Sequence, residues 1–519
     1  MEITFLGHSG FCVETTHANI VIDPWLSTHG AFDSSWFQYP RNQHLASFVI
    51  DKLNDTKKDN FVYVSHEHKD HFDEKFLKSL GPTFTYVVPG FRRPFLRDHL
   101  ANLPCKDVIS FDHADELKFK DGTIKIYLDD NEMNRDSAIL VKSNGESFLN
   151  LNDTKLQDTL PTIAKVDGPF DVFTCQFSGA NWHPVCYQYD NKTYTAISKK
   201  KMLSKFEAVA RSIEFLKPRY YIPAAGPPCF LDPELIEINF QETNIFPRTP
   251  KFIKYLNRRL GKIDVKYPEL MPGDIIDITS DKVKLEANER VDDNEFEAYI
   301  RSYAEDYKHF FDTRKKTYLD NDNHSLLKKL IPPLNSKLKS LTLRNRIKSP
   351  LYLGIKNLND PILRVDFQSG TTKVVNGIND SNYYLMEIPK FEFAQLAENQ
   401  ILWEDLFLTM RVRLYRNPDI YQTIIQGFLT MQPEDVSSFC NRLLEIEESK
   451  ERINVEADGV RYSIDRFCPH QAGDLKQGWI ENGRYLTCPR HRWQFDLWNE
   501  GQCTTSNETI RAVALDDEI

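Results

Sequence analysis

The sequence of 519 residues lacks long apolar runs, an excess of positive charge and regularly spaced cysteines. No apolar stretch approaches the roughly 20 residues that a membrane helix needs, so we expect no membrane partner. The formal net charge of −10 gives no electrostatic reason to expect nucleic acid as a partner. Nine unevenly spaced cysteines do not indicate a disulfide framework. Because the first residues read as a strand rather than a signal peptide, we expect a cytoplasmic protein.

Length and composition predict several folded domains. A chain of this length is too long for one core, and 41% hydrophobic with 27% charged residues is ordinary for globular proteins. Strands and helices alternate through residues 1–282, which predicts an α/β domain. Residues 283–435 are charged and mixed in pattern, as in an α+β domain. Residues 436–519 are punctuated by glycines and predict a small all-β domain.

Apolar periodicity predicts the individual elements. We expect a helix over residues 199–216, because apolar side chains recur there at steps of three and four until Pro218 ends the pattern. In the middle region we expect charged helices over 283–349 with a break at Pro332-Pro333, short strands within 351–388, and helices from 391 to 429. The strands expected in the first domain are 3–6, 11–14, 20–22, 61–64, 84–88, 124–128, 138–141, 148–151, 171–174 and 220–222.

A dense group of histidines follows the expected strand at 61–64. His66, His68, Asp70 and His71 fall within six residues, and imidazole and carboxylate are ligands of zinc, iron and manganese. The alternating His66 and His68 can converge on one metal, while Asp70 and His71 are offset enough to reach a second. Such a cluster at a strand end predicts a metal site rather than solvated loop histidines.

Two Cys/His boxes stand near the other end of the chain. Cys468-Pro-His470 is followed, after 17 residues, by Cys488-Pro-Arg-His491. A Rieske [2Fe-2S] cluster uses two cysteines on one iron and two histidines on the other. A structural zinc site also accepts two cysteines and two histidines, but zinc fingers pair the cysteines in one box. One Cys and one His in each box therefore favour the Rieske cluster, with the other seven cysteines as ordinary thiols.

The first domain resembles the metallo-β-lactamase superfamily. The resemblance rests on the histidine cluster, on Gly7-His-Ser-Gly10 and Asp23-Pro-Trp25, and on the strand that ends at Asn150-Leu-Asn-Asp153-Thr154. It implies an αββα sandwich with one or two metals at the sheet ends. It also implies that His66 and His68 bind one metal, that Asp70 and His71 bind the other, and that Asp153 bridges them.

The sequence departs from that superfamily at two further ligand positions. The segment 129–136 contains no His where one is usual, and Glu132 is the expected substitute, with Asp129, Asp130 and Asn134 as alternatives. The end of the strand at 220–222 continues as Ala224-Ala-Gly226, again without a His. His183 is an alternative ligand from another loop, although a substrate contact or packing role is the better interpretation. By motif position His8 is expected beside the metals rather than on them. His113 has no motif around it, and a surface or core role is expected.

The combination of both modules resembles the CMP-N-acetylneuraminate hydroxylase family. Stretches that carry the resemblance outside the metal domain include Leu402-Trp-Glu-Asp-Leu406 and Arg416-Asn-Pro-Asp-Ile-Tyr421. That family carries its Rieske module first, whereas here it is last. The resemblance implies an O2-dependent iron monooxygenase acting on a nucleotide sugar or another amide or amine. It also implies an external electron donor, such as a reductase, ferredoxin or cytochrome, and it leaves room for a homo-oligomer.

Two other function classes compete with that interpretation. A metal-dependent hydrolase with an accessory redox domain would use the metals to generate hydroxide. An electron-transfer or binding protein would have no catalytic metal chemistry. The missing histidines and the redox module favour the oxygenase, because extra carboxylates suit iron or manganese and a Rieske cluster has no hydrolytic use.

Overall fold

The computed structural model describes residues 1–317, 321–356 and 361–515. Residues 516–519, which the sequence analysis assigns to the last domain, lie outside the described residues. The chain divides into two compact units, each described by itself. The first unit comprises Met1–Asp130, Asn134–Asn181 and Asn191–Phe311, and the second comprises Asn131–Met133, Trp182–Asp190 and Asp312–Ile519.

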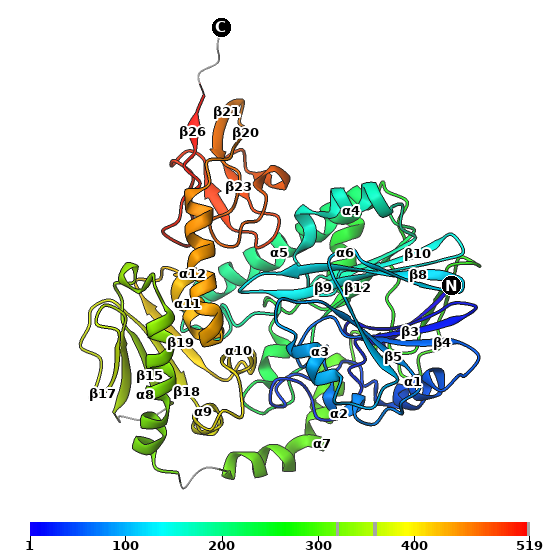
Figure 1. The fold of residues 1–519 in the computed structure, drawn as a ribbon, viewed down its shortest axis with the longest axis horizontal. Helices are drawn as coiled ribbons and strands as arrows, with labels where there is room; N and C mark the ends of the chain where they lie inside the picture. Colours follow the sequence, from blue (N-terminus) through cyan, green and yellow to red (C-terminus); the bar gives the residue numbers. More distant parts are fainter. Residues whose placement is uncertain (318–320, 357–360, 516–519) are drawn as a thin grey trace. The chain divides into compact units, whose positions relative to one another are not determined.

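Two mixed sheets form the first unit (Figure 1). The strand orders are β14-β13-β1-β2-β3-β4-β5-β6 and β12-β11-β10-β9-β8-β7. Every strand that the sequence predicted in this region is present. The bounds are β1 Glu2–Gly7, β2 Gly10–Glu14, β3 Ala18–Ile22, β4 Asp59–Tyr63, β5 Thr85–Pro89, β6 Asp107–Phe111, β7 Glu116–Phe119, β8 Gly122–Asp130, β9 Arg135–Ser143, β10 Glu146–Asn150, β11 Val172–Gln176, β12 Tyr220–Ala224, β13 Ile275–Asp277 and β14 Lys282–Lys284.

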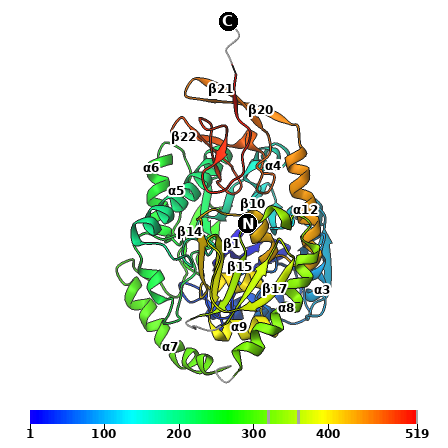
Figure 2. The same cartoon turned by 90° about the vertical axis from the view of Figure 1, so that its left-hand side faces the viewer.

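Helices cover the outer faces of the two sheets. One apolar core contains residues of both sheets, such as Ile20 and Phe148, and therefore lies between them. A second core joins the six-stranded sheet to α5 and α6, which lie side by side (Figure 2). A third joins the eight-stranded sheet to α1–α3. The predicted αββα sandwich is confirmed. The helix bounds are α1 Ala46–Leu53, α2 Glu74–Leu77, α3 Phe95–Leu100, α4 Leu160–Asp167, α5 Asn191–Leu216 and α6 Thr249–Leu260.

Parallel pairing brings the candidate site residues to one edge of the sandwich. Strands β3 and β4 run parallel, as do β10, β11 and β12, so the segments after them emerge at the same end of each sheet. The histidine cluster follows β4 and Asp153 follows β10. The two sheets are tied together at this end, where Ser137 Oγ donates to the carbonyl oxygen of Ser65 at 2.8 Å. This edge is where open α/β sheets usually bind ligands.

The second unit contains a five-stranded sheet of order β17-β16-β15-β18-β19. The predicted break at Pro332-Pro333 is wrong, because α8 continues through both prolines. Leucines at 326, 330, 334 and 338 recur at helical spacing and are buried, and this packing offsets the backbone cost of the prolines. The bounds are α7 Phe296–Lys316, α8 Asn323–Ser340, β15 Leu351–Ile355, β16 Ile362–Asp366, β17 Thr371–Val375, β18 Tyr383–Ile388, α9 Lys390–Ala397, α10 Trp403–Leu408, β19 Arg413–Asn417, α11 Thr423–Thr430 and α12 Pro433–Glu448.

Strand β19 lies where the sequence analysis expected only helices. It pairs antiparallel with β18, so tertiary pairing outweighs local pattern there. The segment Trp182–Asp190 adds to this unit: Gln188 N donates to Leu414 O at 3.1 Å, and the Trp182 ring stacks on Phe407.

The end of the chain forms two small antiparallel sheets around one apolar core. The predicted all-β character is confirmed from β20 onward, whereas residues 436–448, which the prediction included, belong to helix α12. No helix in the described ranges is long and apolar enough to cross a membrane. The bounds are β20 Arg452–Ala457, β21 Val460–Asp465, β22 Trp479–Glu481, β23 Tyr485–Thr487, β24 Gln494–Asp496, β25 Gln502–Cys503 and β26 Val513–Ala514.

Candidate metal centres

The loop after β4 is fixed to the end of β3 by one carboxylate. Asp23 accepts hydrogen bonds from Ser65 N at 2.8 Å and from Ser65 Oγ at 2.6 Å. Asp23 also contacts His71 Nδ1 at 2.7 Å, and neither side chain has any exposed surface. Asp23 therefore holds both ends of the histidine loop and fixes its shape.

The structure brings the predicted histidines and Asp153 together. His66 Nε2 and His68 Nδ1 are 2.8 Å apart, and His71 Nε2 lies 3.6 Å from Asp153 Oδ1. Ligand atoms of His66, His71 and Asp153 all lie within 4.8 Å of one another. Segments far apart in the sequence, after β4 and after β10, thus converge on one point, and three donors at this spacing can share an ion.

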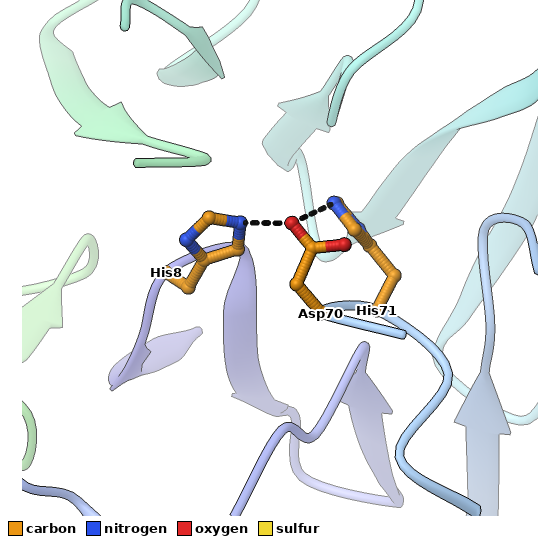
Figure 3. A group of neighbouring side chains, drawn as sticks. All are labelled: His8, Asp70 and His71. Carbon is orange, nitrogen blue, oxygen red and sulfur yellow. Dashed lines mark hydrogen bonds and ion pairs between the residues drawn. The ribbon is translucent and has the colours of Figure 1, made fainter. Parts of the chain in front are cut away.

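A second group of three lies beside the first. His8, Asp70 and His71 also place ligand atoms within 4.8 Å of one another, and all three are buried. His8 Nε2 is 3.0 Å from Asp70 Oδ2, which is 3.9 Å from His71 Nε2 (Figure 3). His8 therefore contacts Asp70, one of the ligands expected from the sequence.

Carboxylates contact the outward nitrogen of two of the imidazoles. Asp23 contacts His71 Nδ1 at 2.7 Å, and Asp136 lies 3.2 Å from His66 Nδ1. A carboxylate in this place fixes the ring orientation and leaves the other nitrogen for a metal. The sequence analysis missed Asp136, although it stands at the start of β9 beside the segment in which a further ligand was sought.

Buried carboxylates surround the histidines of the metal site and perturb their pKa values. Burial opposes a charge on His71, but Asp70, Asp153 and Asp23 outweigh it and raise the pKa of His71 to about 10. Burial and the neighbouring His71 and His68 lower the pKa of His66. Burial, together with Asp153, raises the pKa of Asp136 well above its usual range. Several buried acids thus lie around these imidazoles, and such a concentration of buried carboxylates is an environment that a bound cation relieves.

The donor set fits a divalent metal. Among the described residues, Asp70 Oδ1, His71 Nε2 and Asp153 Oδ1 are buried polar atoms that make no hydrogen bond. A buried polar atom without a hydrogen bond costs free energy unless another partner, such as a metal, takes its place. Mixed imidazole and carboxylate donors suit iron, manganese or zinc.

Asp153 is held from the far side by a buried amide and a buried lysine. Gln176 Nε2 donates to Asp153 Oδ2 at 2.6 Å, and Lys205 Nζ donates to Gln176 Oε1 at 2.7 Å. Gln176 ends β11 and Lys205 lies on α5, so two elements orient one carboxylate. Sequence reasoning missed both residues, because neither belongs to a motif.

The residues predicted to replace the histidine missing from segment 129–136 are not members of either group of three. Asp129 accepts from Asn134 Nδ2 at 3.0 Å and Asp130 accepts from Arg92 N at 2.8 Å, so both carboxylates are engaged by neighbours. Glu132 lies in Asn131–Met133, which groups with the second unit, and its role as a ligand stays a prediction.

The two remaining histidines that the sequence analysis discussed lie outside both groups of three. His183 also belongs to the second unit, where its Nε2 lies 3.1 Å from Tyr189 Oη. His113 is exposed at the surface and accepts a hydrogen bond from Leu128 N.

The two Cys/His boxes form a matched pair of loops. Cys468 N donates to Gly473 O at 2.9 Å, and Cys488 N donates to Trp493 O at 2.8 Å. In each loop the residue four positions after the cysteine, Ala472 or Arg492, donates to the cysteine carbonyl and has positive φ. The same backbone turn thus presents one Cys and one His from each side.

The surroundings of these loops fit the [2Fe-2S] cluster that the boxes predict. Cys468 and Cys488 are fully buried, form no disulfide, and lie close enough for the second thiol to raise the pKa of Cys468 beyond the effect of burial. A Cβ at Gly473 would lie 2.9 Å from Cys488 Sγ, so glycine makes room at the cysteines. The His470 and His491 rings are 4.6 Å apart, and His470 stacks on Trp493 at 4.4 Å.

Comparison with protein families assigns both modules. The Rieske [2Fe-2S] domain family matches residues 430–514, and the β-lactamase superfamily domain family matches residues 2–153. The chain therefore joins a metallo-β-lactamase-like N-terminal domain to a C-terminal Rieske domain. The predictions of both modules and of the [2Fe-2S] cofactor are confirmed.

Several proteins are similar to this chain at low identity. A protein of Mycolicibacterium smegmatis, whose name describes it as a Rieske 2Fe-2S iron-sulfur protein, is 27% identical over 99% of this chain and 100% of its own length. The cytidine monophosphate-N-acetylneuraminic acid hydroxylase of Xenopus laevis is 23% identical over 85% of this chain and 74% of its own. The solved structure of CmlA, a diiron β-hydroxylase from Streptomyces venezuelae, is 14% identical, covers 52% of this chain and 53% of its own, and has a TM-score of 0.33.

Proposed function

We propose that the protein is a Rieske-coupled non-haem iron monooxygenase. The observation that carries the proposal is that one chain holds two kinds of site. A matched pair of Cys/His loops fits an electron-carrying cluster, and a buried His/Asp group fits iron. A Rieske cluster transfers single electrons, which a hydrolase does not need. Similarity to proteins named as hydroxylases supports the same chemistry.

The bound groups would supply electron transfer and O2 activation, and the protein would supply their setting. His66, His68, Asp70, His71 and Asp153 would hold the iron, with Glu132 as a further candidate ligand. Cys468, His470, Cys488 and His491 would hold the cluster. Asp23 and Asp136 would keep the imidazoles of His71 and His66 oriented. Burial of the site would exclude bulk water from the reaction.

The substrate class we propose is a nucleotide sugar or another small amide or amine. Support comes from the similarity to hydroxylases of a cytidine monophosphate sugar, over 85% of this chain. Electrons would come from an external reductase, ferredoxin or cytochrome. From the formal net charge of −10 and the lack of long apolar runs in the sequence, the proposal includes no nucleic-acid or membrane partner. It leaves room for a homo-oligomer.

A metal-dependent hydrolase is the second candidate. It is favoured by one observation: the His66, His71 and Asp153 group suits zinc as well as iron. Zinc there would lower the pKa of a bound water and give a hydrolytic nucleophile. In that case the Rieske domain would be accessory, and its loss would leave turnover intact.

Metal analysis and oxygen uptake separate the two candidates. The oxygenase predicts iron beyond the two atoms of the cluster and O2 consumption that depends on a reductant. His470→Ala should abolish cluster absorption and O2 uptake together, whereas His113→Gln, at the surface, should change neither. Zinc in the first domain with no reductant-dependent O2 uptake would refute the oxygenase. Glu132→Ala tests the remaining ligand: unchanged iron content would remove Glu132 from the set.

A further inference from the structure

The end of β12 lacks the histidine that the superfamily resemblance leads one to expect, and His8 lies against that strand end. Strand β12 ends at Ala224 and is followed by Ala225 and Gly226. Ala225 N donates to the carbonyl oxygen of His8 at 3.0 Å. The turn between β1 and β2 therefore brings an imidazole to the place where this strand end has none.

The local backbone directs the His8 side chain inward. His8 has φ of 51°, in the left-handed region that few residues other than glycine adopt without a reason. Its side chain is buried, and the ring packs edge-on against Trp25 at 5.3 Å and His71 at 5.5 Å. With the ring packed in this way, Nε2 faces Asp70 (Figure 3).

The distances within the second group of three are those of ligands around one ion. Two donors at about 2.1 Å from a shared metal lie roughly 3–4 Å apart. His8 Nε2 and Asp70 Oδ2 are 3.0 Å apart, and Asp70 Oδ2 and His71 Nε2 are 3.9 Å apart. In the described residues, neither His71 Nε2 nor Asp70 Oδ1 makes a hydrogen bond that would compete with a metal.

His71 has one nitrogen facing both groups, and one nitrogen binds one ion. With His71 in the second group, the first metal is left with His66 and Asp153, whose donor atoms lie within 4.8 Å of each other, and with His68, whose Nδ1 lies 2.8 Å from His66 Nε2. Asp153 Oδ1 lies 3.6 Å from His71 Nε2 and can bridge the two positions. The two groups therefore account for two metals without a histidine from β12.

We propose that His8 is a metal ligand, which with Asp70 and His71 holds the second metal. The proposal rests on the metal centre of the proposed function but not on its oxygen chemistry. His8 then replaces, from a different strand, the imidazole missing after β12. The alternative is that His8 only donates a hydrogen bond to Asp70.

Cobalt binding to the full-length protein tests the assignment. The metal-free first domain, with the cluster retained in the second, is titrated with Co(II), and bound cobalt is measured by elemental analysis and visible absorption. Wild type is expected to bind two cobalt ions per chain. His8→Gln keeps an amide donor for Asp70 but loses the imidazole, so it should lose one ion and the matching absorption. When free imidazole is added to the buffer, His8→Ala should bind the second cobalt ion again and show its absorption. His113→Gln should bind cobalt as wild type does.

Two results would overturn the assignment. One is a His8→Gln variant that binds both cobalt ions with wild-type affinity and spectrum, and the other is a wild-type protein that binds only one. If the His8 variants fail to fold, anomalous diffraction from cobalt-loaded wild type decides instead. It should place a cobalt about 2.1 Å from His8 Nε2, and a peak beyond bonding distance refutes ligation. A zinc-filled protein without O2 uptake would refute the oxygenase and leave the ligation of His8 standing.

Discussion

Gln176→Leu should weaken metal binding at the first site although Gln176 is not among the proposed ligands. The substitution removes the amide that donates to Asp153 Oδ2 at 2.6 Å, and it also removes the Gln176 Oε1 atom to which Lys205 Nζ donates at 2.7 Å. A hydrogen bond to a charged group contributes about 1.5–3 kcal/mol. At about 1.4 kcal/mol per tenfold, that corresponds to roughly a 10- to 150-fold change in affinity. Outer partners of metal ligands typically contribute about 10- to 100-fold.

The assay is a competition between the protein and a chelating indicator for Co(II), read as a dissociation constant. Gln241→Leu is the matched control, because Gln241 accepts a hydrogen bond only at the surface, from Tyr194. Lys205→Met should weaken binding less than Gln176→Leu, since it leaves the amide beside Asp153. The reasoning would be refuted if the dissociation constant of Gln176→Leu for Co(II) lay within about twofold of the wild-type value. Loss of the hydrogen bond should change it at least about tenfold.

Three other predictions concern the Rieske loops, one buried lysine and the metals. Trp493→Leu should shift the cluster's reduction potential and broaden its EPR signal, because His470 loses its stacking partner, whereas Trp498→Leu at the surface should not. Burial lowers the pKa of Lys337 to about 7, and the unfolded side chain titrates near pH 10.4. Stability should therefore rise between about pH 7 and 10, and Lys337→Met should remove that slope in thermal melts; equal slopes would contradict it. Metal at 100 times its Kd should stabilise the first unit by about 2.7 kcal/mol, and chelation should reverse the gain in denaturant titrations.

Sequence patterns predicted the elements that repeat a simple period or carry reactive side chains. Most strands of the first unit were predictable because buried β-prone runs alternate with turns, whereas β6, β7, β13 and β14 were not predicted. The Cys/His boxes were predictable because few structural roles need Cys and His at that spacing. Residues such as Asp136, Gln176 and Lys205 were not predictable, because only the stacking of two sheets and a helix brings them to Asp153 and His66.

Helix α8 and strand β19 illustrate a second limit. Pro332-Pro333 and the helical pattern around residue 415 are local signals, and both were outweighed by packing that involves distant residues. His8 was placed beside the metals by its motif. Its distance to Asp70 and the main-chain contact with Ala225 became visible only in the fold.

Reoxidation of the reduced cluster by O2 tests the central claim most directly. The protein is reduced without oxygen and mixed rapidly with O2 in the presence of substrate candidates, and Rieske absorbance is followed in wild type and His66→Ala. We predict that wild type, with iron in the first domain, reoxidises its cluster more than about tenfold faster than His66→Ala does. A tenfold difference in rate corresponds to a difference in activation free energy of about 1.4 kcal/mol. Equal rates in the two proteins, with the cluster intact in both, would contradict electron transfer to an iron centre held by His66.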